Sequence, residues 1–257
     1  MTKAFLHGNP ETGSLWTVLF GELRNRGIND FVALSPPGFG APLPDGFEAT
    51  RIGYRGWLIQ QLERLGGNVD LVGHDWGALH VYGVIAERPD LIRSWAADCA
   101  GIIHPDYIWH DMALAWQTPE VGEESIAAMF GLSEGQRTEL LTSLGIPEDI
   151  AKVMAPDVND IMGECVLSLY RSAAQPEMAN LGKKLKKIEN RPGLVLIASE
   201  DPYTGTMQMC ASVATALGAD IFTLDGLGHW WMFEGAALAA DALIKHWNAA
   251  QHTQTPG

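Results

Sequence analysis

Residues 71–80 read LVGHDWGALH, and this short stretch determines how the rest of the chain is interpreted. An apolar run closes on Gly73-His74-Asp75-Trp76-Gly77 and leads into small residues typical of a packed helix. A Gly-x-nucleophile-x-Gly pattern between a strand and a helix is a nucleophile elbow, a strained turn that exposes the central side chain at the edge of a sheet. Serine usually occupies the centre. A carboxylate there instead predicts attack on a saturated carbon, with an alkyl ester as the intermediate.

The segments on both sides of this turn alternate between strand and helix patterns. Apolar runs bounded by turn residues predict the strands, and apolar residues at helical spacing predict the helices. This alternation is typical of an α/β protein with a parallel sheet and crossover helices. We expect strands within residues 3–8, 30–40, 68–75, 92–101, 193–201 and 220–229, and helices over residues 15–27, 50–65, 76–87, 206–217 and 235–247.

A long segment between two of these strands has a different pattern. From residue 102 to residue 190 the apolar spacing is helical and no strand pattern interrupts it. Ser133 and Gln136 form a capping box, Gly145 is a suitable helix stop, and a further helix is expected to start at Asp157, after Pro156. We therefore predict a core formed by residues 1–101 and 191–257, with residues 102–190 inserted as a helical cap.

Composition limits the partners that the protein can have. The chain of 257 residues is 47% hydrophobic, which is sufficient for a large buried core. Its 31 acidic residues against 17 basic ones give a formal charge of -14, which argues against a nucleic acid or an anionic membrane as partner. We expect a small-molecule substrate. The oligomeric state cannot be read from the sequence.

Cysteine usage and motif content indicate the compartment and the cofactors. Cys99, Cys165 and Cys210 are widely spaced and lack a CxxC pairing, which predicts neither a disulfide framework nor a zinc site. The sequence has no HExxH motif and no P-loop, so we expect no metal and no organic cofactor. Because the N-terminal sequence MTKAFLHGNP has no room for a secretory segment, we expect a cytoplasmic protein.

Three polar residues follow predicted strands in the order nucleophile, acid, histidine: Asp75, Asp201 and His229. The carboxyl ends of parallel strands share one edge of the sheet, where active sites form. His229 would take a proton from the water that hydrolyses an ester on Asp75, and Asp201 would orient the imidazole. The backbone N–H groups of Trp76 and Asn9 are the expected oxyanion donors.

Other residues near these positions leave alternatives open. Glu200 precedes Asp201, and Asp98 follows the strand before the cap, so either is a candidate for the triad acid. Trp116, Trp230 and Trp231 are expected near the cleft. Four other histidines are expected to be packing or surface residues: His74, His80, His104 and His110.

The motifs HGNPETGSLW (residues 7–16), GHDWG (73–77) and LGHWW (227–231) together resemble the α/β-hydrolases with an aspartate nucleophile. This group comprises the epoxide hydrolases and the haloalkane dehalogenases, and the resemblance covers nearly the whole chain. It implies the α/β-hydrolase fold, a mostly parallel sheet flanked by helices with an inserted helical cap. We expect the chain to begin at the strand before the HGxP loop, without the N-terminal hairpin of the family.

The resemblance to epoxide hydrolases implies a proton donor in the cap. Those enzymes open an epoxide against a cap tyrosine followed by arginine, which corresponds to Tyr170 here. A neutral phenol is a suitable donor to the alkoxide that ring opening releases. The second tyrosine of that family is missing around residues 111–124, DMALAWQTPEVGEE, and Tyr107 or Tyr203 are its candidate substitutes.

The resemblance to haloalkane dehalogenases implies a different use of the same site. Those enzymes hold the departing halide between the asparagine of HGNP, here Asn9, and the tryptophan after the nucleophile, here Trp76. Some take their triad acid from the strand before the cap, nearest to Cys99. We favour epoxide hydrolysis, with haloalkane dehalogenation as the alternative. A non-catalytic hydrolase-fold receptor for a small ligand is a further alternative, against which the intact triad argues.

Overall fold

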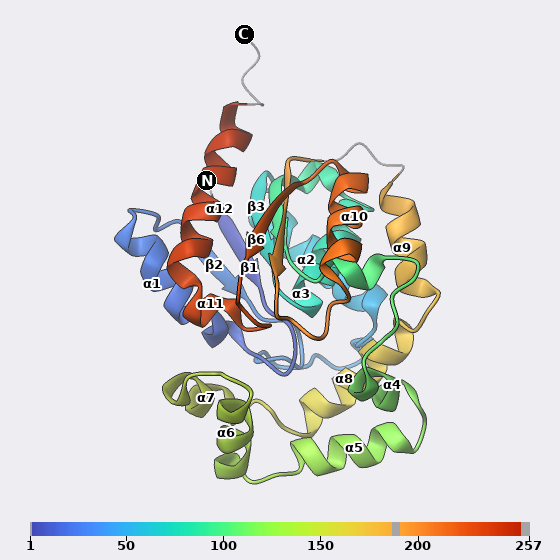
Figure 1. Cartoon of the computed structure of the whole chain (residues 1–257). Coiled ribbons are helices and arrows are strands. Elements are labelled where there is room, and N and C mark those ends of the chain that lie inside the picture. The colour runs from blue at the N-terminus through green and yellow to red at the C-terminus, as the bar shows by residue number, and fades with distance from the viewer. Residues whose placement is uncertain (1, 187–190, 253–257) are drawn as a thin grey trace.

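The computed structural model describes residues 2–186 and 191–252, and these residues form a sheet of six parallel strands in the order β2-β1-β3-β4-β5-β6 (Figure 1). The strands β3, β4 and β5 are buried along their whole length, whereas the edge strands β2 and β6 are largely half-buried or exposed. A strand that is covered on both faces requires a continuous apolar run, such as GLVLIA in β5. The strand bounds are β1 (Lys3–Leu6), β2 (Phe31–Leu34), β3 (Val69–Gly73), β4 (Ile92–Ala97), β5 (Gly193–Ala198) and β6 (Asp220–Leu224).

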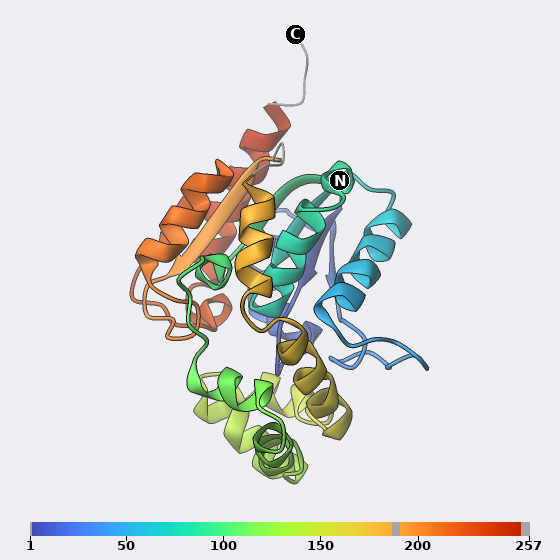
Figure 2. The same ribbon diagram turned by 90° about the vertical axis from the view of Figure 1, so that its right-hand side faces the viewer.

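Helices cover both faces of the sheet (Figures 1 and 2). On one face α1 packs against α12, and on the other α2 and α9 pack against α3 while α10 lies on β5 and β6. The helices α1, α2, α3, α9 and α10 connect successive strands, and the result is the α/β-hydrolase fold that the family resemblance implies. Their bounds are α1 (Thr17–Asn25), α2 (Arg51–Arg64), α3 (Trp76–Ile85), α9 (Glu177–Leu185), α10 (Met207–Leu217), α11 (Trp231–Glu234) and α12 (Ala236–His252), with short 3-10 turns η1 (Gly13–Trp16), η2 (Pro89–Leu91) and η3 (Ala100–Ile103).

Between β4 and α9 the chain leaves the sheet and forms helices beyond the carboxyl ends of the strands (Figure 1). Their bounds are α4 (Asp111–Gln117), α5 (Val121–Phe130), α6 (Glu134–Ser143), α7 (Glu148–Met154) and α8 (Asp160–Ser172). The predicted capping box is present at the start of α6, where Ser133 and Gln136 exchange hydrogen bonds. This group of helices covers the edge of the sheet at which Asp75, Asp201 and His229 were expected.

The largest differences from the predicted helix bounds occur at two helix ends. The helix expected from Asp157 begins at Asp160, because the side chain of Asn159 accepts the N–H groups of Ile161 and Met162 and so supplies the N-cap. The final helix runs beyond residue 247 to His252. Residues 187–190 and 253–257, which the predicted division assigns to the cap and the core, lie outside the described residues. We retain that division as a proposal.

Among the helices of residues 2–186 and 191–252, none is both long and apolar enough to cross a bilayer. The three cysteines are free and buried.

Candidate active site

The turn from β3 into α3 holds Asp75 in a backbone conformation with positive φ. Asp75 has φ +51° and ψ -122°, a strained combination for a residue other than glycine. A Cβ at Gly77 would lie 2.1 Å from the carbonyl oxygen of Leu6, and one at Gly73 would lie 2.7 Å from the backbone of Ala78. The two glycines of GHDWG therefore let α3 approach β1 and β3, and Asp75 stands at the end of the sheet as an elbow requires.

Asp75, Asp201 and His229 lie together at this edge. His229 Nδ1 is 2.7 Å from Asp201 Oδ2, and its Nε2 is 3.9 Å from Asp75 Oδ2. Asp201 is further held by the N–H of Tyr203, which donates to its Oδ1 at 2.8 Å. Since Nδ1 faces a carboxylate, it carries a hydrogen, and Nε2 is the atom directed toward Asp75.

The alternative acids point elsewhere. Glu200 is exposed to solvent, whereas Asp201 beside it faces His229. Asp98 is buried but lies against His74, with 2.5 Å between His74 Nδ1 and Asp98 Oδ2. The geometry thus pairs His229 with Asp201 rather than with either alternative.

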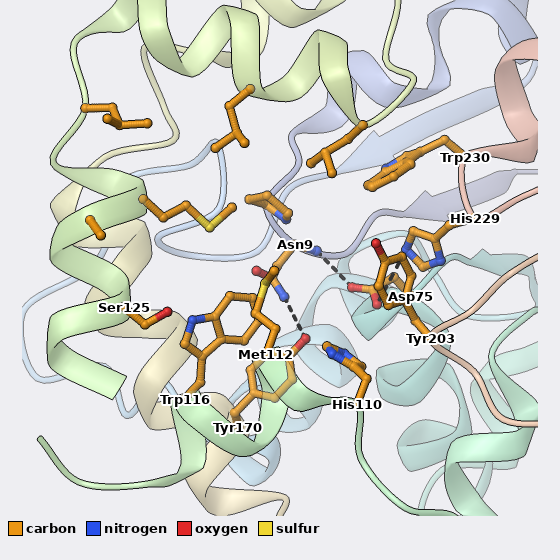
Figure 3. Close-up of a pocket in the computed structure, with 16 residues that line it drawn as sticks. Asn9, Asp75, His110, Met112, Trp116, Ser125, Tyr170, Tyr203, His229 and Trp230 are labelled. Atoms are coloured by element: carbon orange, nitrogen blue, oxygen red, sulfur yellow. Dashed lines mark hydrogen bonds and ion pairs between the residues drawn. The ribbon is translucent and has the colours of Figure 1, made fainter. Parts of the chain in front are cut away.

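Asn9 contacts the site through both its backbone and its side chain. Its N–H donates to Asp75 Oδ1 at 2.9 Å, and its Nδ2 donates to Tyr170 Oη at 3.2 Å (Figure 3). The N–H of Asn9 therefore binds Asp75 Oδ1, whereas Asp75 Oδ2 is the oxygen that faces His229 Nε2. Tyr170 is buried from α8 among the rings of Trp76, Trp109 and Trp116, at centroid distances of 4.9, 5.5 and 4.8 Å. The second expected oxyanion donor, the N–H of Trp76, stays a prediction.

Burial and neighbouring charges set the protonation of these groups. Burial raises the pKa of Asp75 to about 6, although the nearby His229 and His74 oppose this rise. Burial lowers the pKa of His229, but the Asp201 carboxylate outweighs it, so the pKa stays above its usual value. Burial, with the Asp75 charge, raises the pKa of Tyr170 well above its usual value. Near neutral pH Tyr170 is therefore a neutral phenol, able to donate a hydrogen bond.

A cavity of about 390 Å³ opens onto these residues (Figure 3). Asn9, Asp75, Tyr170 and His229 line it from the side of the sheet and from α8. Pro10, Tyr203 and Trp230 line it from the loops that follow β1, β5 and β6. The other lining groups are mostly apolar and come from α4, α5, α6 and the loops beside them: His110, Met112, Trp116, Ser125, Ala128, Met129, Leu132, Leu140 and Leu144. Such a chamber suits a small ligand that is mostly apolar.

The structure distinguishes between Tyr107 and Tyr203, the two candidate substitutes for the second cap tyrosine. Tyr203 lines the cavity, and its ring lies 5.1 Å from that of His229. Tyr107 instead donates its hydroxyl to the carbonyl oxygen of Tyr203 at 2.6 Å, so its hydrogen is already engaged. Of the two, Tyr203 is the one beside His229.

Two histidines expected to be packing or surface residues belong to the site. His110 lines the cavity, and burial lowers its pKa, so the ring is neutral near pH 7. His74 is buried between Asp98 and Glu11, a contact that the sequence interpretation missed. The sequence held a signal for both His74 and Glu11, since His74 adjoins Asp75 and Glu11 directly follows the HGNP loop. His80 is buried against Tyr54, as a packing role predicts.

Within the described residues, two sets of side chains bring potential ligand atoms within 4.8 Å of one another: Glu11, His74 and His229, and Cys99, Asp201 and His229. Hydrogen bonds join Glu11 to His74 in the first set and Asp201 to His229 in the second. These hydrogen bonds account for the grouping, and we assign neither set to a metal.

Family comparison agrees with this architecture. The chain belongs to the alpha/beta hydrolase family, whose model matches residues 4–242. The protein is thus a hydrolase of that superfamily. No curated protein sequence matches the chain.

Solved structures share the fold at low sequence identity. A loop variant of a haloalkane dehalogenase from Bradyrhizobium elkanii has a TM-score of 0.71 at 18% identity, covering 97% of this chain and 91% of its own. An epoxide hydrolase from Vigna radiata has a TM-score of 0.75 at 16% identity, covering 96% and 91%. A thermophilic esterase from Thermogutta terrifontis has a TM-score of 0.72 at 18% identity, covering 97% and 90%. Identities this low show the fold and leave the reaction open.

Proposed function

We propose that this hydrolase is an epoxide hydrolase that converts a small apolar epoxide to a vicinal diol through an ester on Asp75. The observation that carries the proposal is the hydrogen bond from Asn9 Nδ2 to Tyr170 Oη at 3.2 Å. An amide N–H can only donate, so the phenol oxygen accepts there and keeps its own hydrogen for another acceptor. Beside a nucleophilic carboxylate, the oxygen of an opening epoxide is an acceptor that needs this hydrogen.

In the first step, Asp75 Oδ2 attacks a ring carbon and the carbon–oxygen bond of the epoxide breaks. The released alkoxide takes the proton of Tyr170, which is left as a phenolate. The product of this step is an alkyl ester on Asp75 with a free hydroxyl on the adjacent carbon. Because Asp75 Oδ1 accepts the N–H of Asn9, this oxygen becomes the carbonyl oxygen of the ester.

In the second step, His229 Nε2 removes a proton from water, and the resulting hydroxide attacks the ester carbonyl carbon. Negative charge develops on Asp75 Oδ1, where the Asn9 N–H stabilises it. Asp201, 2.7 Å from His229 Nδ1, stabilises the imidazolium. Collapse releases the diol and regenerates the Asp75 carboxylate. The proton held by His229 returns through solvent to the Tyr170 phenolate, so one epoxide and one water give one diol.

The substrate should be uncharged and largely apolar. The described residues that line the cavity include no lysine or arginine that would pair with a carboxylate on the substrate. His110 is neutral near pH 7 and offers no charge either. The volume of about 390 Å³ is near the lower end of the range of about 300–1,000 Å³ typical of ligand pockets.

Haloalkane dehalogenation is the second candidate, favoured by Asn9 and Trp76 beside Asp75. In that reaction the Asn9 amide and the Trp76 indole would bind the departing halide. The Asn9 Nδ2 donor is already engaged by Tyr170 Oη at 3.2 Å, so a halide would have to displace the phenol or share this donor. For this reason we rank dehalogenation below epoxide hydrolysis.

A substrate panel tests the proposal. Terminal epoxides of increasing chain length and the matching 1-bromoalkanes are incubated with the protein, and diol and bromide are measured. We expect diol from the epoxides, no bromide from the bromoalkanes, and no diol with Asp75→Ala as the matched control. Bromide release without diol would establish the dehalogenase, and the absence of both products would reject the proposal.

A further inference from the structure

A second buried charged group, formed by Glu11, His74 and Asp98, lies directly behind the nucleophile. His74 Nδ1 is 2.5 Å from Asp98 Oδ2, and His74 Nε2 is 3.2 Å from Glu11 Oε1. All three side chains are almost completely buried. Because each ring nitrogen faces a carboxylate oxygen, each must carry a hydrogen to bond with it, and an imidazole with two N–H groups is the cation.

The carboxylates of this group are also fixed to both sides of the active site. Asp98 Oδ1 accepts the N–H of Asp75 at 3.0 Å, and Glu11 Oε1 accepts the indole N–H of Trp230 at 2.7 Å. The ring of His74 lies 4.6 Å from the ring of His229. The cation therefore sits beside both the proposed nucleophile and the proposed base, held by partners that leave it little freedom to move.

We propose that His74 is a fixed imidazolium whose charge favours the ionised form of Asp75 and the neutral form of His229, and that Glu11 opposes it with a fixed negative charge. His74 does not touch the substrate in this account; it acts through Asp75 and His229 as a positioning residue. The proposed function needs both states, because the nucleophile attacks as a carboxylate and the base accepts a proton only as a neutral imidazole. The inference thus rests on the proposed function for its purpose, but the charge of His74 is measurable without turnover.

Other titratable groups surround the two imidazoles and contribute to the same balance. They act on His74 and on His229 from the neighbouring loops and strand ends. The groups facing His74 are Glu11, Asp98, His7, Asp75 and His229, and those facing His229 are Asp201, Asp75, His74, Glu11, His110 and Cys99.

The directions of the pKa shifts agree with the geometry. Burial lowers the pKa of His74, but Asp98 and Glu11 outweigh it and raise this pKa well above its usual value. The His74 charge in turn lowers the pKa of Asp75 and that of His229, whereas the Glu11 charge raises the pKa of Asp75. The charge of His74 and, to a lesser extent, that of His229 lower the pKa of Glu11 to about 2. Because the interaction between two charges is mutual, the Glu11 charge also raises the pKa of His229.

Two substitutions with opposite effects on the local charge test the proposal. His74→Gln removes the positive charge, so the pKa values of Asp75 and His229 should both rise. Glu11→Gln removes a negative charge while Asp98 keeps His74 protonated, so both pKa values should fall. His80→Gln is the matched control, because burial lowers the pKa of His80 to about 3 and its replacement removes a neutral imidazole from the same region.

The readout is the pH at which each half-reaction loses activity on the acid side. Alkylation falls as Asp75 is protonated. Ester hydrolysis falls as His229 is protonated. In this half-reaction Asp75 is esterified and carries no charge, so the pH dependence reports the pKa of His229 without coupling to Asp75. For a single charge at this separation we expect shifts of about one pH unit, upward for His74→Gln and downward for Glu11→Gln. Shifts in the same direction in both variants, or shifts no larger than those of His80→Gln, would overturn the proposal.

A titration of the imidazole nitrogens by NMR, without substrate, separates this inference from the proposed function. We expect the His74 ring of the unmodified protein to keep both N–H groups through neutral pH. The His229 titration should move in opposite directions in the two variants. A neutral His74 at pH 7 would overturn the inference even if diol is formed, and a protonated His74 would sustain it even if the substrate panel fails. If His74→Gln does not fold, the unmodified protein and Glu11→Gln decide the outcome.

Discussion

Replacement of Tyr170 by phenylalanine removes one hydroxyl group from the proposed site and leaves the ring in place. Trp76, Trp109 and Trp116 surround that ring, so Tyr170→Phe should keep the packing. The lost partner of Asn9 Nδ2 should cost about 1–3 kcal/mol in the free energy of unfolding, unless the amide rotates to a new acceptor. The variant should therefore fold, and its kinetic defect can be assigned to the missing donor.

The expected size of this defect follows from the burial of the hydroxyl. Loss of a general acid typically slows a step by about 10²–10⁴-fold, or about 3–5 kcal/mol of activation free energy. Tyr170 is only 4% exposed, so bulk water has little access to replace its proton. We therefore expect the upper part of this range, reduced if Tyr203, which lines the same cavity, donates in its place.

The assay is the single-turnover rate of alkylation on the best epoxide from the panel, followed by quenching and mass spectrometry of the protein. Asn9→Ala is the informative comparison, because the contact of residue 9 with Asp75 Oδ1 comes from its backbone and survives the substitution. On an epoxide, Tyr170→Phe should slow alkylation much more than Asn9→Ala does. On a haloalkane the order should reverse, since a halide leaves without a proton. Unchanged epoxide alkylation in Tyr170→Phe would refute the assignment of the donor.

Two further predictions concern the hydrolysis of the ester. His229→Gln should form the alkyl-enzyme but fail to release it, because only the second step needs the base, and intact-protein mass spectrometry should detect the accumulated adduct. A fully active and unmodified His229→Gln protein would exclude this residue as the base. Asp201→Asn should lower turnover by about 10⁴-fold in steady-state assays, since the amide stabilises the wrong tautomer of His229, whereas Glu200→Gln should have little effect. The reverse ranking of these two variants would assign the triad acid to Glu200.

The sequence was sufficient to predict the parallel sheet and the meeting of Asp75, Asp201 and His229 at one edge of it. GHDWG specifies its elbow locally, because Gly73 and Gly77 sit where a Cβ would collide with the backbone. Asp201 and His229 follow the neighbouring strands β5 and β6, and parallel strands bring their carboxyl ends to one edge. Strand-end reasoning therefore found these residues without knowledge of the loops.

The contacts that depend on the direction of side chains could not be predicted. Glu11, His74 and Asp98 come from three different loops, and their pairing depends on rotamers that spacing does not specify. The helix α7 lies inside the segment that was predicted to be helical, but its bounds were not predicted. It has only seven residues and no side-chain N-cap, which leaves little in the sequence to delimit it.

The central claim is that Asp75 forms the covalent intermediate, and one isotope experiment tests it most directly. The protein in excess over epoxide is allowed a single turnover in water enriched in heavy oxygen, and then the peptide containing Asp75 and the diol are analysed by mass spectrometry. Water attacks the carbonyl carbon of the ester in this account, so the label should enter the Asp75 carboxylate, and the diol of the first turnover should carry none. Label in the diol alone, with an unlabelled Asp75, would mean that water attacks the epoxide directly and would contradict the account.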